Sequence, residues 1–308
     1  TPINVGLASI AVLANDSDTE GDRLSVSSAS VDPLLGTVSI NPDGTLAFAP
    51  ALNVSGAVLI TYSISDGQGG SASATLTVNV GPNNAPDSAD KTLSTAEDTA
   101  LTLALADFAF SDGDALQSLA NVRIDSLPLN GSLRLGGVAV TAGQVISAGD
   151  IAAGRLSFVP DLNDNGTPYA SFSFSVQDTA GAFDAAPNSV SLNVTPVNDA
   201  PLALNDTLAP INEDSSVTIS PASLLVNDSD VDGDSLSIAS VQAPVGGTVS
   251  LVGGNVVFTP TPDYAGPASF TYTVIDGQGA SASATVSLTV SAVNDAPQAQ
   301  NDLASTPI

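Results

Sequence analysis

The chain contains the stretch Ser269-Phe270-Thr271-Tyr272-Thr273-Val274, followed by Asp276-Gly277-Gln278-Gly279 and Ser283-Ala284-Thr285-Val286-Ser287-Leu288-Thr289-Val290. In both outer stretches polar residues alternate with apolar ones, which is the pattern of β-strands with one face in a core and one in water. The Asp-Gly turn between them favours a hairpin. The sequence therefore predicts two antiparallel strands at residues 269–274 and 283–290.

The same strand–turn–strand frame occurs twice more along the chain. Its turns are Asp66-Gly67-Gln68-Gly69 and Asp178-Thr179-Ala180-Gly181, and apolar residues occupy every second position on either side of each. No segment has a convincing helical period. Many short strands separated by turn signals predict an all-β protein made of β-sandwich modules of immunoglobulin type.

A repeated phrase marks the seams between the predicted modules. Val197-Asn198-Asp199-Ala200-Pro201 returns as Val293-Asn294-Asp295-Ala296-Pro297, and a relaxed copy, Pro82-Asn83-Asn84-Ala85-Pro86, lies upstream. Each interval between copies has the size of one small domain. The predicted modules are 1–84 with an incomplete first strand, a longer one at 85–199 with an added hairpin near 136–154, one at 200–295, and the start of another at 296–308.

The two ends of the chain share a short sequence. The chain begins Thr1-Pro2-Ile3 and ends Thr306-Pro307-Ile308, and joining the end to the beginning would complete a module. We therefore expect the chain to be one unit of a longer array, with a chance match of three residues as the alternative.

The charge of the chain excludes several classes of partner. It has 32 acidic and 5 basic residues, a net charge of -27, and no Cys. Nucleic acids and anionic membrane surfaces need a basic face, so neither is an expected partner. Without Cys there is no disulfide or thiolate site, and no stretch is long and apolar enough to insert into a membrane.

The acidic residues gather in turns that an immunoglobulin-like topology places at the two ends of a module. Residues 15–22, 111–114 and 227–234 lie in loops at the upper end, together with the turns at Asp66, Asp178 and Asp276. The seam residues and the segments 213–214 and 262–264 lie at the lower end. End-to-end stacking then brings the acids of consecutive modules together, and like charges repel without a cation.

The ligand types point to calcium. Ca²⁺ takes six to eight oxygens from carboxylates, amides, carbonyls and water, whereas Mg²⁺ prefers a smaller octahedron and Zn²⁺ or copper prefer the imidazole and thiolate that this chain lacks. An EF-hand is excluded, because Ala239 stands where the closing acid of the loop from Asp228 should be and no helices flank it. At any single position, an Asx turn without metal is the alternative.

These motifs together resemble cadherin repeats, and more closely the bacterial cadherin-like and Ig-like tandem repeats of giant secreted adhesins, including repeats-in-toxin (RTX) adhesins. The signature from Phe258-Thr259-Pro260 through Tyr264-Ala265-Gly266 to Asp276 is typical of them. The middle module, with Gly131-Ser132-Leu133 and Phe158-Val159-Pro160, is similar to the cadherin-like repeat of chondroitin sulfate proteoglycans. The resemblance implies cadherin-like β-sandwiches stacked end to end in an elongated array.

The resemblance also implies several Ca²⁺ ions, mainly at the junctions between modules. Carried over by position, the second-to-third junction would use Glu97, Asp98, Asp161, Asn198 and Asp199 from one module and Asp228, Asp230 and Asp276 from the next. The following junction would use Glu213, Asp214, Asp263, Asn294 and Asp295. The corresponding upper ends of the first two modules carry Asp16, Asp18 and Asp66, and Asp112, Asp114 and Asp178.

The first junction departs from this pattern. Asn4-Val5 stands where the third module has Glu213-Asp214, Asn53 stands near the position of Asp263, and the seam is Asn83-Asn84. The lower module thus offers amides in place of carboxylates. We expect fewer or weaker calcium ions there, and more bending.

The expected function is that of a calcium-rigidified extender in a large bacterial surface adhesin, which projects adhesive domains for cell-surface or biofilm attachment. We expect an extracellular monomer whose partners are its neighbouring modules, with cell or glycan ligands bound by other domains of the parent. The alternative is a calcium-dependent glycan-binding or cell-binding module, for which the loop residues Tyr169 and Tyr264 are candidates. An enzyme is not expected, because the chain has no His, no Cys and no nucleophile motif.

Overall fold

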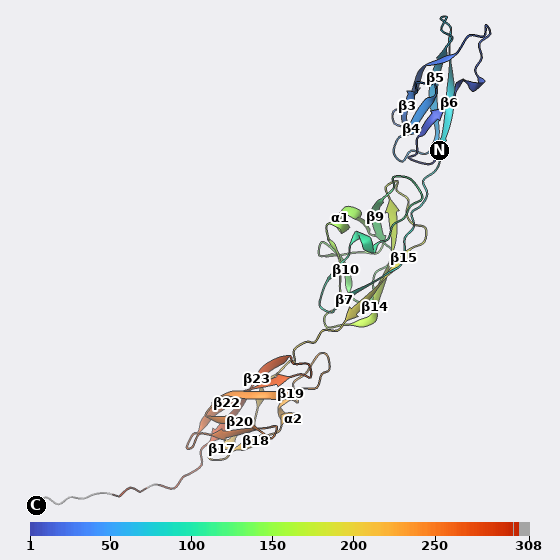
Figure 1. The fold of residues 1–308 in the computed structure, drawn as a ribbon. Coiled ribbons are helices and arrows are strands. Elements are labelled where there is room, and N and C mark those ends of the chain that lie inside the picture. Colours follow the sequence, from blue (N-terminus) through green and yellow to red (C-terminus); the bar gives the residue numbers. More distant parts are fainter. Residues whose placement is uncertain (298, 302–308) are drawn as a thin grey trace, which may run out of the picture. The chain divides into compact units, whose positions relative to one another are not determined.

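The computed structural model describes residues 1–297 and 299–301 of the chain. It divides into two compact units, residues 1–196 and the remainder from Val197 onward. Figure 1 shows strands throughout, and the sheets fall into three β-sandwiches. The first and second sandwiches belong to the first unit and the third sandwich to the second unit.

The first sandwich consists of two three-stranded sheets, β1-β4-β3 and β2-β5-β6. Alternate residues of the strands meet between the sheets, where Phe48, Ile60 and Tyr62 are buried. The elements are β1 (Leu7–Ile10), the 3-10 turn η1 (Leu13–Asn15), β2 (Ser25–Val31), β3 (Gly36–Ile40), β4 (Leu46–Pro50), β5 (Gly56–Ser65) and β6 (Ser71–Val80).

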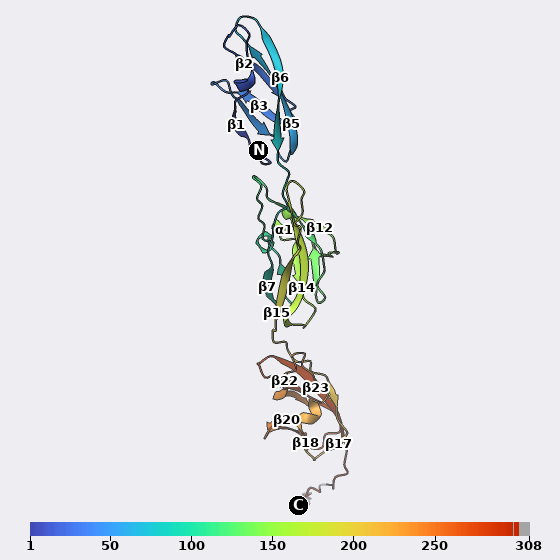
Figure 2. The same cartoon turned by 90° about the vertical axis from the view of Figure 1, so that its right-hand side faces the viewer.

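The second sandwich packs a four-stranded sheet, β11-β10-β13-β8, on a five-stranded sheet, β12-β9-β14-β15-β7. Strand β7 pairs with β15 in parallel, and the two lie side by side in Figure 2. The elements are β7 (Lys91–Ala96), β8 (Leu101–Thr102), η2 (Leu105–Asp107), β9 (Leu119–Ile124), β10 (Ser132–Leu135), β11 (Val138–Ala139), β12 (Val145–Ser147), α1 (Ala148–Ala152), β13 (Leu156–Val159), β14 (Gly166–Asp178) and β15 (Asn188–Thr195).

The third sandwich has one sheet in the order β16-β23-β22-β19, with β17 also paired to β23, and a second sheet β18-β21-β20. The elements are β16 (Asp206–Thr207), β17 (Ile211–Asn212), β18 (Val217–Ile219), α2 (Pro221–Leu224), β19 (Ser237–Val245), β20 (Gly247–Val252), β21 (Asn255–Pro260), β22 (Gly266–Ile275) and β23 (Ser281–Ser291).

The antiparallel strands predicted at residues 269–274 and 283–290 form as predicted. Strands β22 and β23 are antiparallel, and Tyr272 lies opposite Ala284. Phe270, Tyr272 and Val274 are buried, while the Thr residues between them are half-buried, so the period-two alternation separates a core face from an outer face. The all-β fold of tandem sandwiches is therefore confirmed.

The stretch near 136–154 of the second module was predicted to form one added hairpin, and only its first residues do so. Strands β10 and β11 pair as a hairpin around Gly136-Gly137. The following residues form β12 and then the helix α1, which begins after Ser147. The Ser147 side chain accepts a hydrogen bond from the Asp150 N–H, which caps the start of the helix, and its hydroxyl donates one to the Asp150 carboxylate.

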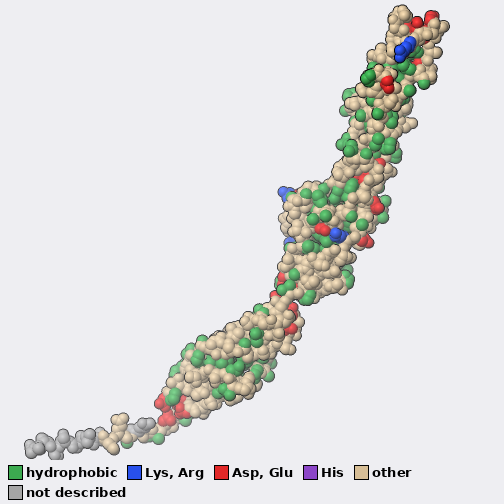
Figure 3. Space-filling model, in the orientation of Figure 1, with side chains coloured by type: hydrophobic (Ala, Val, Ile, Leu, Met, Phe, Trp, Pro, Cys, Tyr) green, Lys and Arg blue, Asp and Glu red, His purple; other side chains and the backbone are tan. Residues whose placement is uncertain are grey.

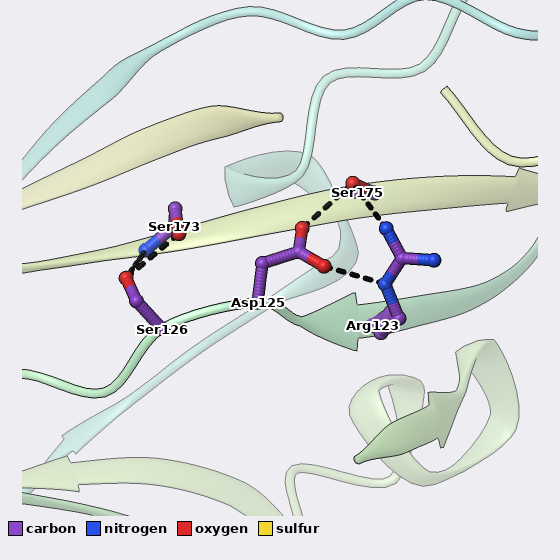
Figure 4. A network of polar contacts seen from close by, with 5 residues as sticks. All are labelled: Arg123, Asp125, Ser126, Ser173 and Ser175. Carbon is purple, nitrogen blue, oxygen red and sulfur yellow. Dashed lines mark hydrogen bonds and ion pairs between the residues drawn. The ribbon is translucent and has the colours of Figure 1, made fainter. Parts of the chain in front are cut away.

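A polar network on the second sandwich uses one of the few basic residues (Figure 4). Arg123 on β9 forms an ion pair with Asp125, and its Nη2 donates to Ser175 Oγ at 3.1 Å. Ser175 Oγ in turn donates to Asp125 at 2.6 Å. Phe183 lies 4.6 Å from the Arg123 guanidinium, measured to the ring centroid. This closed cycle of hydrogen bonds connects β9 to β14. It also gives the buried Ser175 hydroxyl a donor and an acceptor within the protein, so no ligand is needed to account for its burial.

Among the described residues, no helix has the length and apolar character needed to cross a membrane. The predicted start of a further module at 296–308 falls mostly on residues 298 and 302–308, which lie outside the described part of the chain, as does the expected repeat of Thr306-Pro307-Ile308.

Candidate metal-binding ends of the sandwiches

Two turns at the lower end of each sandwich adopt the left-handed backbone conformation. In the third sandwich they are at Asp214 (φ 61°) and Asp263 (φ 59°). Asp and Asn tolerate this conformation better than other residues with a Cβ, which explains the residue types found there. The matching residues of the other two sandwiches, with φ between 52° and 61°, are Asp98 and Asn163, and Asn4 and Asn53.

The third sandwich gathers four acids at this end. Oxygens of Asp214, Asp263 and Asp295 all lie within 4.8 Å of one another. Glu213 is only 5% exposed, and its Oε1 accepts the Val293 N–H at 2.6 Å. Glu213, Asp263 and Asp295 line an open hollow of about 700 Å³. Figure 3 shows the red carboxylates clustered where the chain leaves this sandwich.

The electrostatics of this cluster favour a cation. Although Asp295 is exposed, partial desolvation in the hollow raises the pKa of its carboxyl, and repulsion from Asp214, Asp263 and Glu213 raises this pKa further. A divalent cation among these oxygens would reverse that repulsion. Carboxylate oxygens on turns are the ligands that Ca²⁺ accepts, so the donor set fits this metal.

The upper end of the third sandwich binds the residues of its own seam. Asn198 Nδ2 donates to Asp276 Oδ2 at 2.9 Å, and the Asp199 N–H donates to Asp232 Oδ2 at 2.8 Å. The hydrogen bond from Asn198, followed by those from the backbone of the 276–280 turn, lowers the pKa of Asp276. The buried oxygens Asn198 Oδ1 and Asp230 Oδ2 accept no hydrogen bond from the described residues. Both remain available to water or a cation.

The predicted residue Asp228 is bonded within its own sandwich. Its carboxylate accepts hydrogen bonds from the Leu204 N–H at 2.8 Å and from the buried Tyr272 hydroxyl at 3.0 Å. Asp16 lies in the same relation to Tyr62 in the first sandwich, at 3.4 Å. Asp232 was absent from the predicted set, although its counterpart Asp114 was included. Asp232 is identified as the counterpart of Asp114 because each accepts a hydrogen bond from a backbone N–H of the seam, that of Asp199 and that of Asn84.

The upper end of the second sandwich repeats this arrangement. Asn83 Nδ2 donates to Asp178 Oδ2 at 2.8 Å, and the Asn84 N–H donates to Asp114 Oδ2 at 2.6 Å. The loop residue Asp112 accepts the Asp114 N–H through Oδ1, while its Oδ2 is buried without a hydrogen bond from the described residues. The predicted residues Asp112, Asp114 and Asp178 are thus brought together.

The upper end of the first sandwich holds its acids in closed turns. Asp18 Oδ1 accepts the N–H groups of Glu20 and Asp22, and Asp66 Oδ1 accepts those of Gln68 and Gly70. Their backbone roles are those of ordinary Asx turns.

The lower end of the second sandwich corrects one positional assignment. The Asn163 N–H donates to Asp98 Oδ1 at 2.9 Å, as the Asn53 N–H donates to Asn4 Oδ1 at 2.7 Å. Asn163, rather than Asp161, is therefore the counterpart of Asp263. Asp161 instead accepts the Gly131 N–H at 2.8 Å. Glu97 is 2% exposed, and Asn165 Nδ2 is among its partners at 3.2 Å.

The lower end of the first sandwich requires a similar correction of one residue. Asn4 has the conformation of Asp214, so the pair that matches Glu213-Asp214 is Ile3-Asn4 and not Asn4-Val5. Ile3 is 1% exposed and takes the place of the buried Glu213.

In the third sandwich, Asn294 was predicted as a ligand. Its Nδ2 donates to the Asp295 carbonyl at 3.3 Å.

Two family models match this chain, and several solved structures are similar to it. A model of the bacterial Ig domain matches residues 83–191. Similar solved structures include the human desmocollin-1 ectodomain (13% identity, TM-score 0.37, 91% of this chain and 56% of that chain) and mouse cadherin-23 EC22-24 (16% identity, TM-score 0.34, 94% and 92%). A third is human mucin-like protocadherin EC1-2, at 19% identity and TM-score 0.36, with 68% of this chain and 98% of that chain covered.

This chain spans little more than half the length of the desmocollin ectodomain. A comparison with curated protein sequences gives no match. A model of the cadherin-like domain matches residues 4–81 and 197–291, which together make up more than half of the chain. The protein therefore belongs to the cadherin-like domain family.

Proposed function

We propose that this chain is a calcium-rigidified extender segment of a bacterial surface adhesin. Its cadherin-like and bacterial Ig domains are those of an extracellular adhesion-type repeat. The observation that carries the calcium assignment is the group Asp214, Asp263 and Asp295, whose carboxylate oxygens lie within 4.8 Å of one another beside the buried Glu213.

The composition of the clusters favours Ca²⁺ over other metals. All the side-chain donors are carboxylate or amide oxygens, and the chain has neither His nor Cys for Zn²⁺ or copper. The donors sit on turns, which suits the flexible coordination of Ca²⁺ better than the strict octahedron of Mg²⁺. By position, Glu97 and Asp98 would serve the end of the second sandwich as Glu213 and Asp214 serve the third.

Calcium binding at module ends would control the stiffness of the array. Without metal, carboxylates gathered at the ends of successive modules repel one another and loosen the connections. Millimolar Ca²⁺ outside the cell would order them, so that the array holds adhesive domains of the parent protein away from the cell surface. Attachment to cells or within a biofilm is the role that such a spacer would serve.

The alternative role as a glycan-binding module has no specific support. Tyr169 is 7% exposed, and its hydroxyl lies 3.1 Å from Asp164 Oδ2. Tyr264 donates its hydroxyl proton to the Pro267 carbonyl. Tyr169 thus lies within β14 and not in the predicted loop, and both tyrosines are packing residues whose hydroxyls are bonded within the sandwich.

The proposal is tested by calcium titration of the whole chain in a calorimeter. The triple variant Asp214→Asn, Asp263→Asn, Asp295→Asn should bind fewer ions than the parent chain. Asp43→Asn is the control, because it makes the same chemical change in a turn where, among the described residues, Asp43 accepts hydrogen bonds from the Thr45 N–H and hydroxyl. Equal binding by the triple variant and the parent would contradict the assigned site.

The spacer role is tested separately by small-angle scattering. The maximum dimension of the chain should be larger and better defined in millimolar Ca²⁺ than in EDTA. An identical scattering profile in the two conditions would contradict calcium-dependent stiffening even if the ions bind.

A further inference from the structure

We propose that the joint between the first and second sandwiches is closed by amide hydrogen bonds that take the place of calcium ions. The inference deepens the proposed function, on which its comparison with calcium-binding ends rests. Both sandwiches lie within the first unit, and the contacts between them are hydrogen bonds of defined geometry. The lower end of the first sandwich thus fits the upper end of the second as an interface without metal.

The first observation is a complete loss of carboxylates from the lower side of this joint. The four acids of the third sandwich are Glu213, Asp214, Asp263 and Asp295, and the matching residues of the first sandwich are Ile3, Asn4, Asn53 and Asn84. Neutral amides are weak calcium ligands compared with carboxylates, since they bring no charge to offset the dehydration of the ion. The lower side therefore lacks the charge that a shared calcium site needs.

A linked change occurs at the neighbouring position. In the third sandwich the buried Glu213 carboxylate accepts the Val293 N–H. In the first sandwich Ile3 removes the acceptor, and Pro82, which matches Val293, has no N–H to donate. Donor and acceptor are lost together, so the first sandwich leaves no unpaired group where the third has this bond.

The second observation is a set of hydrogen bonds that cross the joint. Asn4 Nδ2 donates to the Ala115 carbonyl at 3.0 Å, and Asn53 Nδ2 donates to the Thr179 carbonyl at 3.0 Å. From the other side, Gln117 Nε2 donates to Asn53 Oδ1 at 3.1 Å. The Thr179 hydroxyl donates to Gln117 Oε1 and fixes the orientation of this amide.

These bonds require amides. An amide offers two N–H donors and a carbonyl acceptor, whereas an ionised carboxylate only accepts. If Asn4 and Asn53 were aspartates, their oxygens would face the Ala115 and Thr179 carbonyls, and a cation would have to lie between them. The amides therefore make direct contact where carboxylates would need a bridging ion.

The carboxylates that remain on the upper side are also satisfied by amides. Asn84 holds both oxygens of Asp114, through its N–H at 2.6 Å and its Nδ2 at 2.8 Å. Asp178 accepts Asn83 Nδ2 at 2.8 Å and the Ala182 N–H at 2.8 Å. One buried oxygen, Asp112 Oδ2, accepts no hydrogen bond from the described residues. Loss of the carboxylates alone predicts a looser joint, but the amide network favours one that is ordered with or without calcium.

The experiment measures the width of a distance distribution across this joint. The chain has no Cys, so the double variant Ser39→Cys, Ala142→Cys places one spin label on an exposed residue of each sandwich. Pulsed electron paramagnetic resonance on the full chain should give the same narrow distribution in EDTA and in millimolar Ca²⁺. A distribution that is broad in EDTA, whether or not calcium narrows it, would overturn the proposal.

Two further variants test whether the amides are the cause. Asn53→Ala with Gln117→Ala should broaden the distribution in both conditions, whereas Asn121→Ala, which removes an amide bonded to Gln177 within the second sandwich, should leave it narrow. The variant Asn4→Asp, Asn53→Asp, Asn84→Asp introduces three of the four acids of the third sandwich, all but the counterpart of Glu213, and should make a narrow distribution depend on Ca²⁺. Unchanged narrow distributions in the Ala double variant would overturn the role of the network.

Failure of this inference and failure of the proposed function give different results. The calorimetric titration reports calcium binding at the acids of the third sandwich, and the spin labels report order at the first joint in EDTA, where no calcium takes part. A chain that binds no calcium but keeps a narrow distribution would overturn the proposed function alone.

Discussion

At the residue scale, Asp228 at the upper end of the third sandwich also supports the core, because it accepts a hydrogen bond from the buried Tyr272. The Tyr272 hydroxyl is fully buried and lies 2.9 Å from Asp206 Oδ2 and 3.0 Å from Asp228 Oδ2. Burial raises the pKa of Tyr272, and the two carboxylates raise it further, so the hydroxyl keeps its proton and donates it. Burial likewise raises the pKa of Asp206, with repulsion from Asp228 adding to it.

Replacing Tyr272 with Phe should therefore destabilise the third sandwich. A hydrogen bond to a charged group contributes about 1.5–3 kcal/mol, and its loss leaves two carboxylates facing each other without a donor. Urea denaturation followed by circular dichroism measures the effect. Tyr62→Phe is the comparison, because the Tyr62 hydroxyl makes only long contacts of 3.3 Å to the Val12 carbonyl and 3.4 Å to Asp16. Equal losses for the two variants would argue against the charged hydrogen bond.

Asp150 should give a stability contribution that depends on pH. The Ser147 hydroxyl at 2.7 Å, and then Arg155 at 2.9 Å, lower the pKa of the Asp150 carboxyl. A carboxyl whose folded pKa lies below its unfolded value of about 3.9 stabilises the fold above that value and loses the contribution as the pH falls through the folded pKa. NMR titration should find a lowered pKa for Asp150 in the folded chain.

Asp150→Asn should accordingly reduce the loss of stability between neutral pH and pH 3, since Asn does not titrate. Ser147→Ala removes the larger cause and should raise the Asp150 pKa toward its ordinary value. An Asp150 pKa that does not respond to Ser147→Ala would assign the shift to Arg155 instead.

At the element scale, each sandwich places a glycine against the ring of a strand phenylalanine. Gly36, Gly131 and Gly247 begin or precede the strands that pair with β4, β13 and β21, which carry Phe48, Phe158 and Phe258. A Cβ added to Gly247 would lie 2.4 Å from the Thr259 carbonyl oxygen and 2.8 Å from the Phe258 ring. The backbone is therefore packed too closely for any other residue.

Gly247→Ala should cost about 1–3 kcal/mol of unfolding free energy, because the strand pair must separate to admit the methyl group. Gly277→Ala is the control in the same sandwich, since an added Cβ there meets nothing within 4 Å. The urea midpoints of the two variants measure this difference. If Gly277→Ala lowers the midpoint as much as Gly247→Ala does, crowding around the added Cβ is not the cause of the destabilisation.

The strands were predictable from sequence because period-two alternation is a property of the strand itself, as in β22 and β23. The helices α1 and α2 were missed because four or five residues are too few to show a helical period. Ser147 with Asp150, and Ser220 before Pro221, are capping signals that could have located them.

The candidate site residues were predictable by type but not always by register. Asp161 and Asn163 are two residues apart in one turn, and the left-handed φ of 52° together with the hydrogen bond from its N–H to Asp98 identifies Asn163 as the match to Asp263. The pairing of Ile3-Asn4 with Glu213-Asp214 depends on the same observation. The amide network at the first joint joins residues more than a hundred positions apart, such as Asn4 and Ala115, and no local pattern specifies such a pair.

At the scale of the whole molecule, the net charge of -27 opposes the folded state through general repulsion as well as at particular ends. Any salt reduces the repulsion between distant charges by screening. The repulsion between the acids gathered at one end of a sandwich is relieved only by a cation that they coordinate. The two effects can be separated, because screening depends on ionic strength and coordination depends on the identity of the ion.

Calcium should therefore stabilise the chain more than sodium chloride of the same ionic strength. A ligand that binds only the folded state at 100 times its dissociation constant adds about 2.7 kcal/mol. Urea denaturation in millimolar CaCl₂ and in matched NaCl, each after removal of residual metal by EDTA and dialysis, measures the difference. The Asp214→Asn, Asp263→Asn, Asp295→Asn variant should lose part of the calcium-specific gain while it keeps the gain from screening. Equal stabilisation by the two salts would mean that these acids are a charged surface and not a binding site.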